Sequence, residues 1–278
     1  MRYFSGSSPC ALIIAFNVSI RVILALGWIL GVVLARGAGA LSWSFLTNLP
    51  TPPSVPDGGM ANAIYGTVVM TALATGLGVP LGLFAGVFLA EFGKGSRFAA
   101  CVRFMNNVLM GTPSIIVGIF VYTVIVIPTG TFSGYAGSVA LAIIVLPVVA
   151  RASEDMLSLV PNSLRESALA LGAPHWKVTL NVVFRAAKVG LLTGTLLAVA
   201  RVSGETAPLL FTALNSPYWP GSLAAPTANL TVTIFNYAMS PFVDWQQMAW
   251  GASFLITAGV LLLTVFARLT LQRRKKTS

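Results

Sequence analysis

The sequence predicts an all-α integral membrane protein with six transmembrane helices. Of its 278 residues, 56% are hydrophobic and only 9% are charged, whereas soluble domains are about 25% charged. Several apolar runs reach the roughly 20 residues that a helix needs to cross the hydrocarbon layer. These runs recur towards the C-terminus, which excludes a signal peptide followed by a soluble domain. The predicted spans are 10–35, 62–90, 104–127, 135–151, 185–210 and 247–267.

Two long loops separate spans on the outer side. The first, 36–61, contains the segment TNLPTPPSVPDGGM, whose four prolines and paired glycines exclude a regular helix or a central strand there. The second, about 211–246, carries Tyr and Trp residues that suit a membrane interface. Within it, the segment from Thr231 to Ala238 is expected to form a short re-entrant or surface helix.

Small residues recur every four positions in two spans. The stripe of span two is Ala74, Gly78, Gly82, Gly86 and Ala90, and the stripe of span five is Gly190, Gly194 and Ala198. This spacing lets helix backbones approach closely in lipid, where packing replaces the hydrophobic driving force. Two interpretations stay open: packing between helices of this chain, or an interface with a second membrane subunit.

The distribution of Lys and Arg predicts that both termini are cytoplasmic. Fourteen of the seventeen cationic residues then lie on the inner side, only Arg36 lies outside, and Arg21 and Arg201 fall within spans. The net charge of +10 does not indicate nucleic-acid binding, because the cations flank spans and lack interleaved aromatic residues. Cys10 and Cys101 are both expected at the cytoplasmic side as reduced thiols without a role.

The largest inner loop, 152–184, contains a short amphipathic helix. Ser163 and Glu166 stand three residues apart, which predicts a capping box, and Gly172 is expected to end the helix in a left-handed conformation. The predicted helix runs from Leu164 to Leu171 and places Leu164, Ala168 and Leu171 on one face. A helix this short is unstable alone in water. It either lies against the membrane or its own bundle, or inserts into a groove on a separate motor protein.

Two charged pairs are predicted in or near the membrane. Arg201 and Glu205, at i and i+4, fall within span five, where a charge costs about 2.5–3.5 kcal/mol on insertion scales. They either neutralise one another or bind an anion along a transport pathway, since a guanidinium can hold two phosphate oxygens. Arg151 and Glu154 form the second predicted pair at the inner end of span four, as a local anchor or as a functional pair.

Several longer segments resemble one transporter family. Glu166-Ser167-Ala168 followed by Gly172 resembles the EAA loop of importer-type ABC permeases, although Val182-Val183-Phe184-Arg185 stands where that pattern has Ile-x-Leu-Pro. The more specific segments are 58–63 (GGMANA), 112–122 (TPSIIVGIFVY), 204–214 (GETAPLLFTAL) and 238–242 (AMSPF). These resemble PstA-type permeases of phosphate-specific ABC importers, with similarity from about residue 40 to 270.

The resemblance implies a MetI-like permease fold in a single domain over 1–278, with a core module at about 62–270. It implies a bacterial inner-membrane subunit that forms half of a phosphate pathway. Arg201, Arg151 and Glu154 match family positions regarded as functional, and Glu205 is added here as the neighbour of Arg201. Leu164, Glu166, Ala168, Leu171 and Gly172 would couple the chain to a separate ATPase.

The resemblance also implies partners. These are a homologous PstC-type permease, a dimer of PstB-type ATP-binding subunits that carries ATP and Mg, an extracytoplasmic PstS-type phosphate-binding protein, and membrane lipid. The chain itself carries no GxxxxGK[ST] loop, metal-ligand cluster or positioned nucleophile, so no catalytic or metal site and no cofactor are expected in it. The competing hypotheses are a permease for another oxyanion, a self-sufficient secondary carrier or channel, and a membrane enzyme.

Overall fold

The computed structural model describes residues 9–275, and the side chains of residues 16–265. Within this part of the chain, every regular element is helical. The elements up to the middle of the chain are α1 (Pro9–Gly37), η1 (Ala38–Ala40), α2 (Trp43–Thr47), α3 (Ala61–Val87), η2 (Phe88–Phe92), α4 (Arg97–Gly111), α5 (Ser114–Val121), η3 (Tyr122–Val126) and α6 (Ile127–Thr129). Of these, η1 is a 3₁₀ turn, and η2 and η3 are π-helical turns.

The second half of the chain has the same character. Its elements are α7 (Gly134–Ser158), α8 (Asn162–Ala170), α9 (His175–Val178), η4 (Thr179–Val183), α10 (Phe184–Val202), α11 (Ala207–Leu210), α12 (Leu230–Ala238) and α13 (Val243–Lys275). By length and composition, five helices of the described chain can cross a membrane, and the bent pair Arg97–Gly111 and Ser114–Thr129 can make a sixth.

The third predicted span is not one straight helix. The prediction placed a continuous helix over 104–127, but the chain bends by 102° between α4 and α5. Pro113 lacks an N–H group, and a residue before proline avoids the helical region. Thr112 is accordingly extended, with φ −74° and ψ 129°.

The fifth predicted span, 185–210, is displaced towards the N-terminus. The apolar helix covers His175–Val202, because α9, η4 and α10 run on without a break. The segment 182–185 lacks the proline of the EAA-loop pattern, and a chain without proline can continue a helix there. The span ends at Val202, so Glu205 lies beyond it, in the turns that precede α11.

The small-residue stripes pack inside this chain. Gly78, Gly82 and Gly86 of α3 face α7, and an added Cβ at Gly82 would lie 2.7 Å from the carbonyl oxygen of Leu146. Gly190 and Gly194 of α10 face Met156 and Ala152 of the same helix α7. Close helix contact through small residues is therefore what joins α3, α7 and α10, as the intrachain interpretation predicted. The main core beside these contacts includes Met70, Leu141, Val145, Val149, Val202 and Val232.

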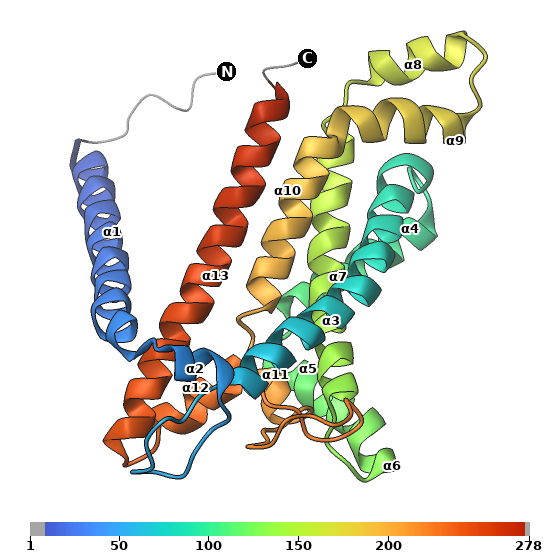
Figure 1. The fold of residues 1–278 in the computed structure, drawn as a ribbon. Coiled ribbons are helices and arrows are strands. Elements are labelled where there is room, and N and C mark those ends of the chain that lie inside the picture. The colour runs from blue at the N-terminus through green and yellow to red at the C-terminus, as the bar shows by residue number, and fades with distance from the viewer. Residues whose placement is uncertain (1–8, 276–278) are drawn as a thin grey trace.

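The first outer loop has no regular helix or strand where its prolines and paired glycines fall, as predicted. After α2, the segment 48–60 has no helix, and the N–H groups of Gly59 and Met60 donate to the carbonyls of Leu49 and Phe45 at 2.9 and 2.8 Å. The predicted short helix near Thr231 exists as α12. Figure 1 shows α12 and α11 at one end of the molecule, whereas α8 and α9 project from the other end, where α1 begins and α13 finishes.

Candidate functional sites: a docking helix and a charged cavity

Helix α8, which is the predicted docking helix, begins differently from the prediction. It starts at Asn162 rather than Leu164, and Pro161 occupies the N-cap position without any side-chain cap. The fixed φ of proline suits the start of a helix, which places Ser163 inside the first turn. The predicted capping box is therefore absent: the carbonyl of Ser163 accepts a hydrogen bond from the Ser167 hydroxyl at 2.8 Å.

The end of α8 follows the prediction closely. Gly172 is left-handed, with φ +82°. The N–H of Gly172 donates to the carbonyl of Leu169 at 2.9 Å, and the N–H of Ala173 donates to the carbonyl of Ala168 at 3.4 Å. These two bonds define a Schellman motif, in which glycine at the left-handed position avoids a Cβ clash.

The apolar residues of α8 do not share one environment. Leu171 is 88% exposed and Leu164 is 45% exposed, and Glu166 is also exposed. Ala168 instead packs on a cluster that includes Leu157 and Val178. Ala168 therefore packs α8 against the bundle, whereas Leu164 and Leu171 leave apolar surface exposed. Figure 1 shows α8 projecting beyond the long helices.

The predicted pair of Arg151 and Glu154 does not form. The Arg151 Nε donates to the Asp155 carboxylate at 3.1 Å, one turn along α7, and both side chains are nearly half exposed. Such an exposed i, i+4 pair contributes about 0.3–0.5 kcal/mol. Arg151 thus takes part in a local ion pair, with Asp155 rather than Glu154 as its partner.

Glu154 is buried and faces a different helix. The Arg103 Nε of α4 donates to its carboxylate at 2.6 Å. The same guanidinium donates through Nη2 to the carbonyl of Leu89, at 2.9 Å. Arg103 was predicted only as one of the inner-side cations, because nothing local in the sequence relates it to a carboxylate 51 residues away.

A second buried pair was missed by sequence reasoning. Glu91, at the inner end of span two, accepts from the Arg165 Nη2 of α8 at 2.6 Å, and the residues are 7% and 8% exposed. The signal in the sequence that could have revealed this pair is Glu91, an acidic residue directly after an apolar span. The chain has only seven acidic residues, and one that ends an apolar span needs a cation.

Arg201 and Glu205 line one small cavity. It has a volume of about 180 Å³ and lies where the bend between α4 and α5 meets α7 and the end of α10. Besides the two charged residues it is lined by Leu109, Met110, Thr112, Pro113, Ser114, Val117, Ile143, Ile144 and Val148. The structure thus brings both predicted residues to one site, although they do not share a helix.

The side chains of Arg201 and Glu205 do not neutralise one another. Within the described residues, neither side chain makes a hydrogen bond or an ion pair. Arg201 is exposed and Glu205 is partly buried. The guanidinium therefore keeps all five donors available to a ligand or to water, in a cavity large enough for several water molecules.

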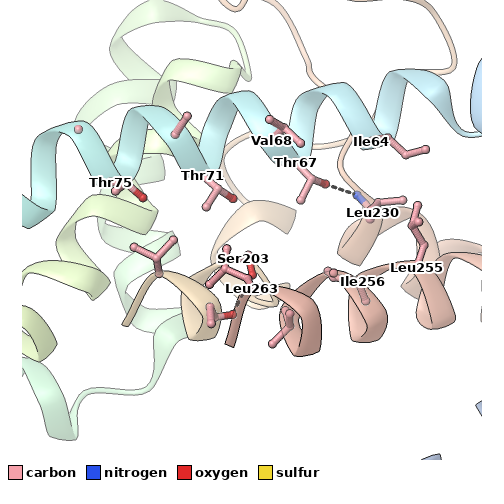
Figure 2. A pocket seen from close by; sticks show the side chains of 16 residues that line it. Ile64, Thr67, Val68, Thr71, Thr75, Ser203, Leu230, Leu255, Ile256 and Leu263 are labelled. Carbon is pink, nitrogen blue, oxygen red and sulfur yellow. Dashed lines mark hydrogen bonds between the residues drawn. The ribbon is translucent and has the colours of Figure 1, made fainter. Parts of the chain in front are cut away.

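A larger cavity, of about 720 Å³, lies between α3, α10 and α13. Figure 2 shows that Leu255, Ile256 and Leu263 face the Thr67, Thr71 and Thr75 side of α3 across it. The Thr67 hydroxyl is already engaged, accepting from the N–H of Leu230 at 2.8 Å. None of the residues that line this cavity is charged, and most of them are apolar.

Among the residues that the structure describes, no group of three or more His, Cys, Asp or Glu side chains could hold a metal ion. Cys101 is a free, exposed thiol. The side chain of Cys10 and the basic residues 273–276 lie outside the described side chains, so the structure gives no contacts for them.

In the described residues, an all-helical bundle of five or six candidate spans, with a projecting helix pair at one end and a charged cavity, defines a multi-span membrane protein. The chain belongs to the family of binding-protein-dependent transport system inner membrane components, whose sequence profile matches residues 78–276, and within it to the PstA group of permeases. Members of this family are transport components, so the chain is a transport subunit rather than an enzyme.

Two curated relatives are close in sequence, and both are phosphate transport system permease proteins PstA. The protein of Yersinia pestis is 48% identical over 248 residues, which cover 89% of this chain and 84% of the relative. The protein of Haemophilus influenzae is also 48% identical over 248 residues, covering 89% of this chain and 88% of the relative.

The fold also matches a solved structure. The inward-facing MetNI methionine ABC transporter superposes with a TM-score of 0.60 at 20% identity. The match covers 78% of this chain and 95% of that chain. It supports the predicted MetI-like permease fold.

Proposed function

We propose that this chain forms half of the translocation pathway of an ATP-driven phosphate importer. The observation that carries the proposal is the guanidinium of Arg201 in the cavity at the α4–α5 bend, which has no partner among the described side chains. Arg201 lies one residue before the end of α10 at Val202, and a guanidinium there can bind two phosphate oxygens in parallel. The PstA relatives point to phosphate as the anion.

Glu205 would make the binding of phosphate at Arg201 reversible. Its carboxylate lines the same cavity as Arg201 without engaging it, so an arriving anion meets one attractive and one repulsive group. A transport site must bind weakly enough to release its substrate. Arg151 and Glu154 are proposed to contribute further along the pathway, and the buried bridge from Glu154 to Arg103 would hold α4 against α7 there.

The open edge of α8 is the proposed contact with a PstB-type ATP-binding subunit, which would carry ATP and Mg. Leu164 and Leu171 expose apolar surface to solvent, and burial of such surface is the usual driving force of association. Glu166 would lie at the rim of this contact. A homologous PstC-type permease would complete the pathway, and a PstS-type binding protein would deliver phosphate from outside.

We place the chain in the bacterial inner membrane with both termini cytoplasmic. The distribution of cations supports this orientation, as does the position of α8 and α9 at the end where α1 begins and α13 finishes (Figure 1). In a background without Cys10 and Cys101, single cysteines at Ser54 and Ser222 are expected to react with an impermeant thiol reagent in intact cells. A cysteine at Lys94 or Ser278 is expected to react only after lysis. Labelling of Lys94→Cys in intact cells would reverse the orientation.

The proposed function is tested by purification and reconstitution. In mild detergent, the chain is expected to retain a nucleotide-binding subunit and a second permease. Proteoliposomes of that complex with the binding protein should take up phosphate only with ATP. Uptake without ATP would support a self-sufficient carrier instead, and sulfate or molybdate uptake in place of phosphate would support a permease for another oxyanion.

A further inference from the structure

The junction between the docking helix and the bundle is built on one π-helical turn. This turn, Phe88–Phe92, ends span two and carries Glu91 inside the protein, where it is 7% exposed. The carbonyl of Leu89 in the same turn also accepts a side-chain hydrogen bond. A helix end leaves several carbonyls without intrahelical partners, so this turn offers acceptors that side chains from other helices can reach.

Arg165 of α8 bonds to three parts of the chain from one buried guanidinium. Its Nη2 donates to Glu91 at 2.6 Å and to the carbonyl of Leu157 at 2.8 Å. Its Nη1 donates to the carbonyl of Val160 and to the Asn162 amide oxygen, the latter at 3.3 Å. Arginine can bridge this many acceptors because its five donors lie in a fixed plane. The docking helix is thereby joined to the ends of both α3 and α7.

Arg103 of α4 also bonds to this turn. Its Nη2 bonds to the carbonyl of Leu89, and its Nε bonds to Glu154 of α7. The turn thus connects α8, through Arg165, with α4 and α7, through Arg103. Because α4 leads to the bend that lines the Arg201 cavity, this junction lies between the docking helix and the proposed substrate site.

The helices behind the junction have little freedom to slide. Gly82 of α3 lies so close to α7 that an added Cβ would be 2.7 Å from the carbonyl oxygen of Leu146 and 2.9 Å from the Cβ of Val149. Close-packed interiors transmit displacement rather than absorb it. A movement of α8 is therefore carried to α3 and α7 together, provided that the Arg165–Glu91 bridge holds.

We propose that Arg165 and Glu91 are positioning residues that transmit movement of the docking helix to the spans. This inference rests on the proposed function, because it requires an ATPase that moves α8. The alternative is that the bridge only stabilises the folded chain. The two differ in one measurable quantity, the phosphate taken up per ATP hydrolysed by the assembled complex.

The test uses the reconstituted complex with its partner subunits. Arg165→Lys keeps the charge but loses the planar fork and two of the five donors, so it cannot reproduce the full set of bonds to Glu91, Leu157, Val160 and Asn162. We expect this variant to assemble and to hydrolyse ATP, with phosphate uptake per ATP reduced at least tenfold. Glu91→Gln keeps the size of the side chain but removes its charge, and we expect a smaller loss of the same kind.

Lys94→Gln is the matched control, because Lys94 is an exposed cation three residues after Glu91. Its uptake per ATP is expected to equal that of the wild type. If the complex with Arg165→Lys does not assemble, the uptake per ATP of the Glu91→Gln complex tests the proposal instead. Unchanged uptake per ATP in the deciding variant, even with less complex assembled, would overturn the positioning role. If the wild-type complex takes up no phosphate with ATP, the proposed function fails. That outcome differs from unchanged uptake per ATP in a variant, which contradicts only the positioning role.

Discussion

The double replacement Arg201→Met with Glu205→Leu is expected to assemble normally and to lose phosphate uptake. Neither side chain has a charged partner among the described residues, so removing both leaves no buried charge uncompensated. The double variant removes the guanidinium that we propose binds the anion. A hydrogen bond to a charged group is worth about 1.5–3 kcal/mol, so uptake per assembled complex should fall by about ten- to a hundredfold. The measurement is phosphate uptake in a strain that lacks other phosphate importers.

Arg201→Lys separates charge from geometry. Lysine keeps the positive charge but not the planar fork that binds two oxygens, so a pathway role predicts weakened uptake and a purely electrostatic role predicts little change. Arg185→Met is the control, since Arg185 is an exposed cation near the other end of α10. Wild-type uptake in the double variant would remove Arg201 and Glu205 from the pathway and leave Arg151 and Glu154 as its candidates.

Gly172→Val is expected to uncouple transport from ATP hydrolysis. The left-handed φ of +82° costs an L-residue about 1–2 kcal/mol, and a β-branched side chain is a strong outlier there. An added Cβ meets no other atom within 4 Å, so the cost is backbone strain alone. The chain after α8 should be misdirected, and ATP-driven uptake should fall by about tenfold or more.

Gly172→Asn provides the matched control. Asparagine tolerates the left-handed region far better than valine does, so this variant should retain most of its uptake. Expression and association with the second permease should survive in both variants, because Gly172 is exposed and outside the spans. If well-folded Gly172→Val protein transports normally, α8 is only a surface feature and not a coupling element.

The sequence by itself determined the class of protein, most span positions and the end of helix α8. Each of these depends on short stretches of chain. An apolar run long enough to cross the membrane must be helical, because no water is present to satisfy its backbone. Glycines four residues apart predicted close helix packing, and α3 meets α7 through them. Gly172 took its left-handed conformation because only local sterics decide it.

Only the tertiary structure decided which charges meet. Spacing along the chain suggested Arg151 with Glu154 and Arg201 with Glu205, yet Glu154 bonds to Arg103, 51 residues away, and Glu91 bonds to Arg165, 74 residues away. The bend at Pro113 and the end of α10 at Val202 then placed Arg201 and Glu205 around a cavity instead of on one helical face. An unpaired buried charge is costly, so it pairs with an opposite charge that the packed helices place beside it. Which residue lies there depends on the packing of the whole bundle rather than on the neighbouring sequence.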